Sequence, residues 1–356
     1  MYVTAVLPVA LAVLALATAT PSSQSANAKP TPAMQAVLDE LAALGPKPID
    51  SLSPEEARKQ PSPADAVKAL LKKKGMSTAP EPVGNVANRS IDGPGGAIPI
   101  RIYTPKGSGP FPVLVYFHGG GWVIANLDTY DASARALANA AGAVVVSSHY
   151  RQAPEHKFPA AAQDAFAAYR WTLENAKSIN GDPRRIAVAG ESAGGNLATG
   201  VAMQARDQNV QLPVYQLLVY PVTNHAFDTE SYREHANAKP LNAATMKWFW
   251  GHYLASPDDG AKPLASVLRG NLRGLPAATV VTAEIDPLRS ESKAYADALR
   301  KAGVDVKLHE FSGVTHEFFG MGAVVPQAKE AVQRSASDLK VGFKAGAAGT
   351  SGKKGQ

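Results

Sequence analysis

Apolar residues recur every three or four positions across residues 32–44, which is the spacing of one helix face, and Gly45-Pro46 ends the pattern. A second helical region begins after Ser53, a residue suited to capping a helix, and two prolines interrupt it. The helical spacing then resumes over residues 64–74. The pattern therefore predicts a small layer of helices in this part of the chain.

Beyond this layer the pattern changes to extended runs. Residues 86–91 and 98–103 flank a glycine-rich turn and predict a β-hairpin. From residue 113 short apolar runs alternate with helical stretches, which predicts an α/β fold with a mostly parallel sheet covered by helices on both faces. Residues 221–276 break this alternation and contain an aromatic-rich helix around Trp248. We expect strands at residues 113–117, 143–148, 186–189, 216–220, 278–283 and 305–311, and helices at 130–141, 160–177, from 193 onward, 288–302 and 326–343.

The first 28 residues carry no charged side chain and include an apolar run at residues 5–17. This run has the length of a signal peptide and is short for a membrane span. Ala26-Asn27-Ala28 fits a cleavage site, with residues 17–19 as a second candidate. We therefore expect residues 1–28 to be a signal peptide and the protein to be exported, periplasmic or secreted, without a stable membrane span after cleavage. No Lys or Arg lies between Met1 and the apolar run, although a signal peptide normally begins with one. A misplaced start of the sequence and an uncleaved membrane anchor therefore remain alternatives.

Composition narrows the function classes. The chain has 356 residues, of which 45% are hydrophobic and 19% charged, so it can build a large globular core around one catalytic domain. It contains no cysteine, which excludes disulfides, a thiolate nucleophile and a Cys-ligated zinc. Much of the net charge of +6 lies in a Gly/Ala/Ser-rich tail that has no acidic residue after Asp338. We therefore expect no nucleic-acid partner.

The segment Gly190-Glu191-Ser192-Ala193-Gly194 has the form of a nucleophile elbow. A predicted strand precedes it and a predicted helix follows, which is the context that this motif requires. The flanking glycines permit a tight turn that exposes the serine hydroxyl, and the helix start directs the N–H of Ala193 toward an oxyanion. A chance match in a Gly/Ala-rich stretch is the blander interpretation.

A second glycine-rich loop follows the strand at residues 113–117. It reads His118-Gly119-Gly120-Gly121-Trp122, and its backbone N–H groups could approach a substrate oxygen without obstruction. The loop lacks the Lys-Ser or Lys-Thr pair and the GxGxxG spacing of phosphate-binding loops. We interpret it as an oxyanion hole, with His118 as a hydrogen-bonding residue of the loop.

The order serine, acid, histidine selects the remaining catalytic candidates. Of eight histidines, His316 alone follows a late strand in a loop, whereas His309 lies inside that strand. Asp286 follows the preceding strand and is the best acid, although Glu284 lies nearby and Asp286 could instead cap a helix. Position 320 is glycine, so His316-Glu317 does not form a metalloprotease motif. No metal or cofactor is expected.

With these motifs in order, the chain resembles the hormone-sensitive-lipase-like branch of bacterial carboxylesterases in the α/β-hydrolase superfamily. The resemblance spans residues 32–343 and includes the HGGGW loop, the segment at 150–155 that resembles YRLAPE, and the GESAGGN-type elbow. It implies an α/β-hydrolase fold with an N-terminal helical cap. It also implies a serine carboxylesterase acting on short- to medium-chain acyl esters. The implied site residues are Ser192 as nucleophile, Asp286 as acid, His316 as base, and backbone N–H groups of Ala193 and two of Gly119, Gly120 and Gly121, with Gly120 and Gly121 favoured.

The resemblance also implies a layout of the whole chain. Residues 29–85 form a helical cap region, 86–345 the catalytic domain, 221–276 a part that contributes to the cap, and 346–356 a disordered tail. Two positions depart from the family pattern: His149 stands where aspartate is usual, and Ser290 replaces another aspartate. An amidase or lactonase with the same triad, a catalytically inactive ligand-binding protein and a homodimer remain open alternatives.

Overall fold

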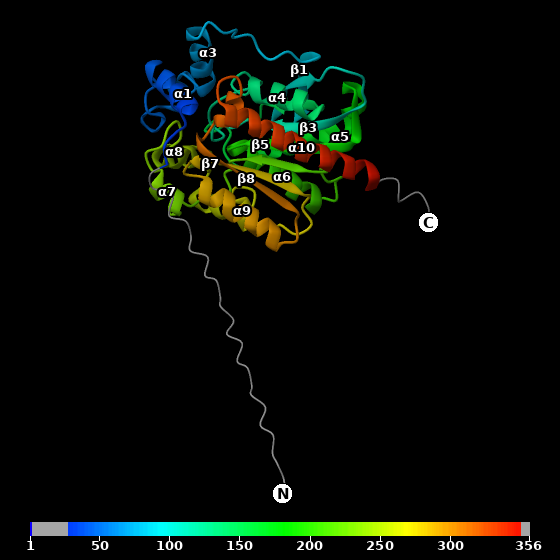
Figure 1. Cartoon of the computed structure of the whole chain (residues 1–356). Helices are drawn as coiled ribbons and strands as arrows, with labels where there is room; N and C mark the ends of the chain where they lie inside the picture. The colour runs from blue at the N-terminus through cyan, green and yellow to red at the C-terminus, as the bar shows by residue number, and fades with distance from the viewer. Residues whose placement is uncertain (2–27, 350–356) are drawn as a thin grey trace, which may run out of the picture.

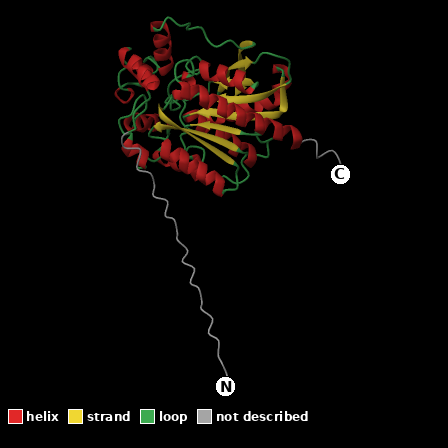
Figure 2. Cartoon of the chain, in the orientation of Figure 1, coloured by secondary structure: helices red, strands yellow, loops and turns green. Residues whose placement is uncertain are grey.

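The computed structural model describes residue 1 and residues 28–349. Residues 2–27, which hold most of the expected signal peptide, and residues 350–356 lie outside the described residues. The fold is built on one eight-stranded sheet in the order β1-β2-β4-β3-β5-β6-β7-β8 (Figures 1 and 2). The strands are β1 Asn85–Gly93, β2 Gly96–Thr104, β3 Phe111–Phe117, β4 Val144–Ser148, β5 Gly181–Glu191, β6 Gln216–Val219, β7 Ala278–Ile285 and β8 Val306–Thr315.

The predicted hairpin is confirmed, because β1 pairs antiparallel with β2 around the turn at residues 93–96. β2 also pairs antiparallel with β4, and every pair from β4 through β3 to β8 is parallel. Parallel neighbours need crossover helices, which the chain supplies between consecutive strands. The predicted α/β-hydrolase fold with a mostly parallel sheet is confirmed.

Helices cover both faces of this sheet. One face packs against α4 and α10, and the other against α5, α6 and α9. The helices are α1 Pro32–Ala43, α2 Pro54–Ala57, α3 Pro63–Lys73, α4 Asp131–Ala141, α5 Ala160–Asn175, α6 Ala193–Asp207, α7 Glu230–Glu234, α8 Ala243–Tyr253, α9 Arg289–Lys301 and α10 Pro326–Gly349.

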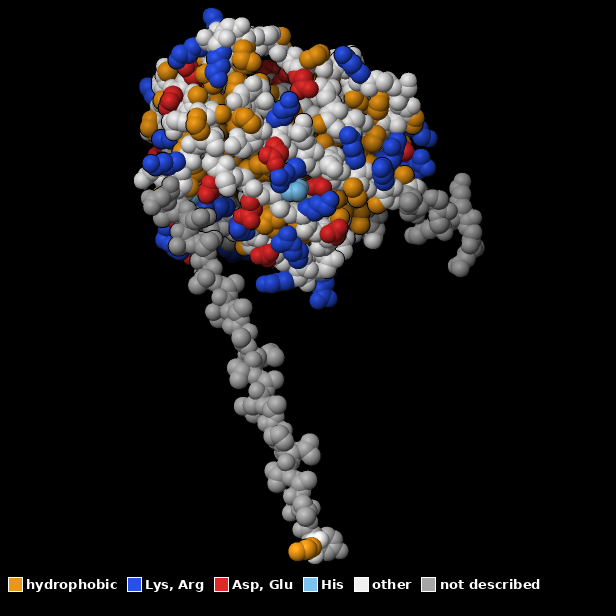
Figure 3. All heavy atoms as spheres, in the orientation of Figure 1, with side chains coloured by type: hydrophobic (Ala, Val, Ile, Leu, Met, Phe, Trp, Pro, Cys, Tyr) orange, Lys and Arg blue, Asp and Glu red, His pale blue; other side chains and the backbone are white. Residues whose placement is uncertain are grey.

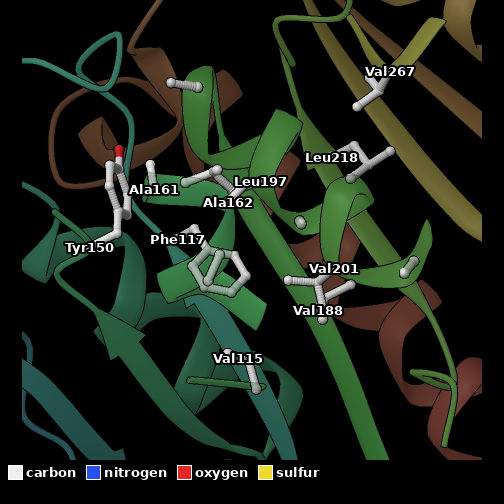
Figure 4. Close-up of a cluster of buried hydrophobic side chains, with 14 of the residues drawn as sticks. Val115, Phe117, Tyr150, Ala161, Ala162, Val188, Leu197, Val201, Leu218 and Val267 are labelled. Carbon is white, nitrogen blue, oxygen red and sulfur yellow. The ribbon is translucent and has the colours of Figure 1, made fainter. Parts of the chain in front are cut away.

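The period-two pattern of β3 divides the core into these two layers. Val115 and Phe117 point into the layer with α5 and α6, which Figure 4 shows together with Val188 and Leu197. Leu114 and Tyr116 point into the opposite layer. Burial of each such side chain contributes about 1.5–3 kcal/mol, so the central strands are held from both sides.

The final helix is longer than the sequence pattern predicts. The sequence predicts a helix over residues 326–343 and a catalytic domain that ends at residue 345, but α10 continues to Gly349. Its glycines allow this extension to pack closely: a β-carbon at Gly342 would lie 2.6 Å from the Tyr215 ring, and one at Gly346 would lie 2.5 Å from Val214. The expected tail therefore begins later than residue 346, and its remainder lies outside the described residues.

Acidic and basic side chains are interspersed over the face drawn in Figure 3. Several of the surface charges are paired with a residue four positions away in the chain, as Lys59 is with Glu55 and Arg334 with Glu330. Among residues 28–349, no helix has both the length and the apolar character needed to cross a bilayer.

The N-terminal helices lie together at one end of the molecule, near α8 (Figure 1). Capping boxes begin α2 and α3, where Ser53 pairs with Glu56 and Ser62 with Asp65. The indole N–H of Trp248 on α8 donates to the Leu52 carbonyl at 3.1 Å. The segment between β6 and β7 therefore contacts the N-terminal layer directly.

Arg58, at the end of α2, fastens this layer to the catalytic domain. Its guanidinium donates to the carbonyl oxygens of Val123 and Ala153, both at 2.8 Å. It also binds Glu155 through two hydrogen bonds of 2.7 Å, and this pairing lowers the pKa of Glu155 to about 2. Val123 follows the glycine-rich loop, so one side chain joins the N-terminal helices to the wall of the predicted site.

Replacing Arg58 with Met should loosen the N-terminal helices without unfolding the sheet. Loss of the two bonds to backbone carbonyls and of the bidentate ion pair should raise the local opening equilibrium about tenfold. Subtilisin should therefore cleave within residues 29–85 about ten times faster, as followed by mass spectrometry. Lys59→Met is the matched control, because Lys59 is the next residue in the chain and pairs with Glu55, four residues before it, and not with the catalytic domain. Equal cleavage rates in the two variants would contradict this role.

Candidate active site

Ser192 occupies a strained turn between β5 and α6. Its backbone has φ +56° and ψ −119°, a conformation that side-chain-bearing residues rarely adopt. The flanking glycines are required sterically, since a β-carbon at Gly190 would lie 2.1 Å from the Gly194 carbonyl oxygen. A β-carbon at Gly194 would lie 2.0 Å from the carbonyl oxygen of Phe117. The elbow therefore forms only with glycine on both sides of the serine.

The glycine-rich loop lies next to this turn. Gly120 and Gly121 have φ values of +92° and +57°, and both line one pocket with Ser192. The N–H groups of Gly120 and Gly121 donate to no other backbone group within residues 28–349. Ala193 begins α6, where the first N–H of a helix has no intrahelical partner. These are the three N–H groups that the resemblance favours as oxyanion donors, and that role stays a prediction.

Gly119 occupies a different position in the loop. It is absent from the described residues that line the pocket, and a β-carbon there would lie 2.3 Å from the Tyr130 hydroxyl oxygen. This close approach to the tyrosine explains why position 119 requires glycine. Gly119 thus serves the packing beneath the loop, whereas Gly120 and Gly121 face the pocket.

The predicted acid and base meet at the carboxyl edge of the sheet. His316 follows β8 directly and donates its Nδ1–H to Oδ2 of Asp286 at 2.7 Å. The other carboxylate oxygen of Asp286 accepts the Leu288 N–H at 2.8 Å, so Asp286 caps the following turn as well. Glu284 accepts the N–H of Gly313 at 2.7 Å and so supports the loop backbone. Asp286 is the acid that holds the imidazole.

Burial alone would lower the pKa of His316, which is 2% exposed. The Asp286 carboxylate reverses this effect and raises the pKa above its ordinary value, with smaller contributions from Glu317 and Glu191. His316 and Ser192 line the same pocket. The imidazole is therefore placed and poised to accept a proton from a nearby group.

A group of buried carboxylates and tyrosines under the site was not predicted. Glu191 accepts hydrogen bonds from Tyr116 at 2.6 Å and from Tyr220, whose ring lies 4.4 Å from that of His316. Burial, assisted by the charge of Glu317, raises the pKa of Glu191 to about 7. Glu191 and Glu317 stand next to Ser192 and His316 in the sequence, but adjacency alone does not show which way a side chain points.

The two departures from the family pattern have local explanations. His118 donates to the Gly119 carbonyl at 2.8 Å, and its Nε2 lies 3.1 Å from Nδ1 of His149. Burial and the neighbouring His149 lower the pKa of His118 to about 3, so this pair is neutral near pH 7. With histidine at position 149, the carboxylate that binds Arg151 comes from Asp164 on α5, through hydrogen bonds of 2.8 Å. The histidine at position 149 thus orders the loop, and Asp164 neutralises the arginine.

Ser290 forms a reciprocal pair with Ser231 of α7. The Ser231 N–H donates to the Ser290 hydroxyl at 3.1 Å, and the Ser290 N–H donates to the Ser231 hydroxyl at 3.0 Å. Ser231 also donates to the Pro287 carbonyl at 2.7 Å, directly after Asp286. Serine at this position therefore fixes the acid loop through α7.

A pocket of about 850 Å³ opens above Ser192 and His316. The N-terminal helices supply one wall, and Phe249 of α8 another, with its ring against Gly121. Trp250 is buried and packs on Trp122, so of the three aromatic residues in this run Phe249 alone combines pocket lining with contact to the loop. Residues 28–349 contain no cluster of three His, Asp or Glu side chains that could hold a metal ion.

Comparisons with known proteins agree with this architecture. A family model described as alpha/beta hydrolase fold matches residues 114–320. The chain is 44% identical over 248 residues to carboxylesterase NlhH of Mycobacterium tuberculosis, covering 68% of this chain and 78% of that protein. It is 36% identical over 288 residues to ethyl acetate hydrolase of Pseudomonas putida, covering 80% and 88%.

A solved structure of similar shape is the hyperthermophilic esterase from the archaeon Pyrobaculum calidifontis. The TM-score is 0.80 at 37% identity, and the match covers 88% of this chain and 98% of that one. The region matched by the family model, residues 114–320, contains the elbow, the glycine-rich loop and the acid and base loops. The chain therefore belongs to the alpha/beta hydrolase fold family, in its hormone-sensitive-lipase-like branch.

Proposed function

We propose that this protein is a serine carboxylesterase that hydrolyses short- to medium-chain acyl esters through an acyl-enzyme. The observation that carries the proposal is the pairing of His316 with Asp286 at 2.7 Å in a pocket that also contains the strained Ser192. The similarity to proteins named carboxylesterase and ethyl acetate hydrolase supports the same reaction class. The substrate is a small ester, and the chemistry requires neither metal nor cofactor.

The steps follow from the geometry of the site. Because Asp286 holds the Nδ1–H of His316, Nε2 is the acceptor nitrogen, which takes the Ser192 proton as Oγ attacks the ester carbonyl. The N–H groups of Ala193, Gly120 and Gly121 stabilise the oxyanion. His316 then protonates the leaving alcohol, and the same nitrogen activates water to release the acid from the acyl-enzyme.

Phe249 is the residue best placed to limit the acyl group. Its ring packs against Gly121, is 4% exposed and lines the pocket. A bulky, fixed ring beside the oxyanion donors leaves little room for a long chain in that direction. Apolar residues of the lining, among them Leu38 and Leu41 of α1 and Leu241, accommodate the rest of the substrate. This arrangement supports a preference for shorter acyl chains.

Ser192→Ala should abolish ester turnover and labelling by fluorophosphonate reagents while the protein remains folded. Loss of the nucleophile should lower kcat by about 10⁶, and the residual rate would come from the oxyanion donors. Short-chain p-nitrophenyl esters, lactones and amides assayed on the purified wild-type protein measure the reaction class. Wild-type protein that binds these ligands but turns over none of them would instead be a binding protein.

Asp286→Asn keeps the shape of the acid but offers an amide to His316, which favours the wrong tautomer. We expect kcat to fall by about 10³ to 10⁴. Glu284→Gln is the matched control, because Glu284 bonds the Gly313 N–H and not the imidazole. Both variants are assayed at saturating short-chain ester, with folding checked by circular dichroism. If Glu284→Gln loses activity and Asp286→Asn retains it, then Glu284 and not Asp286 is the acid of the triad.

Export is part of the proposal. Thr31 donates its N–H to the Gly313 carbonyl at 2.8 Å, so the chain is tied to the catalytic domain three residues after the proposed cleavage point. A mature chain beginning near Lys29 would keep this bond. N-terminal sequencing of protein from the native host should find Lys29 at or near the first position. Soluble cytoplasmic protein that retains Met1 would refute export.

A further inference from the structure

Glu317 holds an unusual backbone conformation beside the base. It follows His316 and has φ +70°, in the left-handed region where glycine is favoured. Its two carboxylate oxygens accept the hydroxyl of Tyr130 at 2.7 and 2.8 Å. A non-glycine residue in this conformation persists only where the surroundings fix it, and such residues concentrate at functional sites. The structure thus fixes a carboxylate at this point of the pocket.

The carboxylate lies beside the nitrogen that receives the proton. Glu317 Oε1 is 3.7 Å from Nε2 of His316, whereas Nδ1 is bonded to Asp286 at 2.7 Å. The imidazole therefore has one carboxylate at each nitrogen. The longer separation leaves Nε2 free to take a hydrogen bond from Ser192, while the opposite charge remains within the range that stabilises an imidazolium.

We infer that Glu317 is a positioning residue for the base, whose carboxylate stabilises the His316 imidazolium that forms each time Ser192 or water gives up its proton. The inference rests on the proposed esterase function. The neutral imidazole of the resting site gains less from the carboxylate than the charged imidazolium does. The interaction therefore strengthens as the transition state is reached, and this difference accelerates a reaction.

Several other groups lie around the same imidazole, and the effect of each on the pKa of His316 has a known sign. Asp286 and Glu191 also raise the pKa of His316, and the tyrosine hydroxyls are neutral because burial raises the pKa of each. On the N-terminal side the pocket is lined by charged residues of both signs: Asp39, Lys47, Arg58, Lys59, Asp65 and Lys68. In the catalytic domain, Asp286 after β7 bonds His316, the Tyr220 ring after β6 lies against it, and the charge of Glu191 on β5 acts on it. Tyr116 on β3 and Tyr130 before α4 donate to Glu191 and Glu317.

The direction of the pH effect follows from the sign of the charge. A carboxylate beside His316 raises the pKa of the imidazole, so the acidic limb of the kcat/KM profile lies at higher pH in its presence. Removing the carboxylate should move this limb to lower pH. His118 does not titrate in the same range, because its pKa is lowered to about 3. Burial raises the pKa of Glu191 to about 7, so this carboxyl titrates near the same pH, and the test depends on the shift of the limb between variants and not on its position.

Two substitutions separate charge from backbone strain. Glu317→Gln keeps the shape and the strained backbone but removes the charge, and Glu317→Gly removes the charge and relieves the strain. Both should move the acidic limb down by about one pH unit and lower the plateau kcat about tenfold. Asp39→Asn is the matched control, since Asp39 lines the same pocket and its loss also removes one negative charge.

The limb is measured twice on each purified protein, from kcat/KM for a p-nitrophenyl ester and from the rate of inactivation by a fluorophosphonate. A shift in both Glu317 variants but not in Asp39→Asn supports the inference. An unmoved limb in either Glu317 variant, or an equal shift in the control, overturns it. Wild-type protein that neither hydrolyses the esters nor reacts with the fluorophosphonate would instead refute the proposed function, and leave no base to position.

Discussion

The close contact between the elbow and the neighbouring strand is the constraint on which the site depends. Gly194 lies so near the carbonyl of Phe117 that a single methyl group would not fit, and this contact sets the distance between the start of α6 and the end of β3. The glycine-rich loop begins directly after Phe117. The positions of Ser192 and of the glycine-rich loop are thus fixed by one packing contact, before any substrate binds.

A rigid, dry site makes nearby charges effective and demands that each be balanced. His316 and Asp286 are almost fully buried, as is Glu191, and in such surroundings a carboxylate is stable only with donors around it. Tyr116 and Tyr220 donate to Glu191, and Tyr130 donates to Glu317. The tyrosines therefore permit two acidic side chains to remain under a catalytic base, where they favour its protonated form.

The sheet, the elbow and the pairing of Asp286 with His316 could be predicted from the sequence because each leaves a local pattern. Buried parallel strands leave apolar runs, and a turn with φ near +60° leaves flanking glycines. The role of Glu317 leaves no such pattern, since its direction depends on Tyr130, 187 residues away in the chain. The pairing of Arg151 with Asp164 and the anchor from Arg58 to Glu155 likewise join distant segments. The length of α10 was underestimated because the glycines near its end have low helix propensity, while the packing of Gly346 against Val214 is a tertiary contact that the sequence does not show.

The walls of the pocket come from segments outside the sheet and its motifs. Phe249 comes from α8, and the opposite wall comes from helices held by Arg58. Because Arg58 bonds to the Val123 carbonyl, and Val123 donates its N–H to the Gly120 carbonyl at 3.0 Å, the cap helices are connected to the oxyanion loop through two consecutive hydrogen bonds. A movement of these helices that admits a larger ester would therefore also pull on the loop that stabilises the oxyanion. If the loop stabilises the oxyanion as proposed, we expect substitutions that widen the pocket near Arg58 to alter kcat as well as KM.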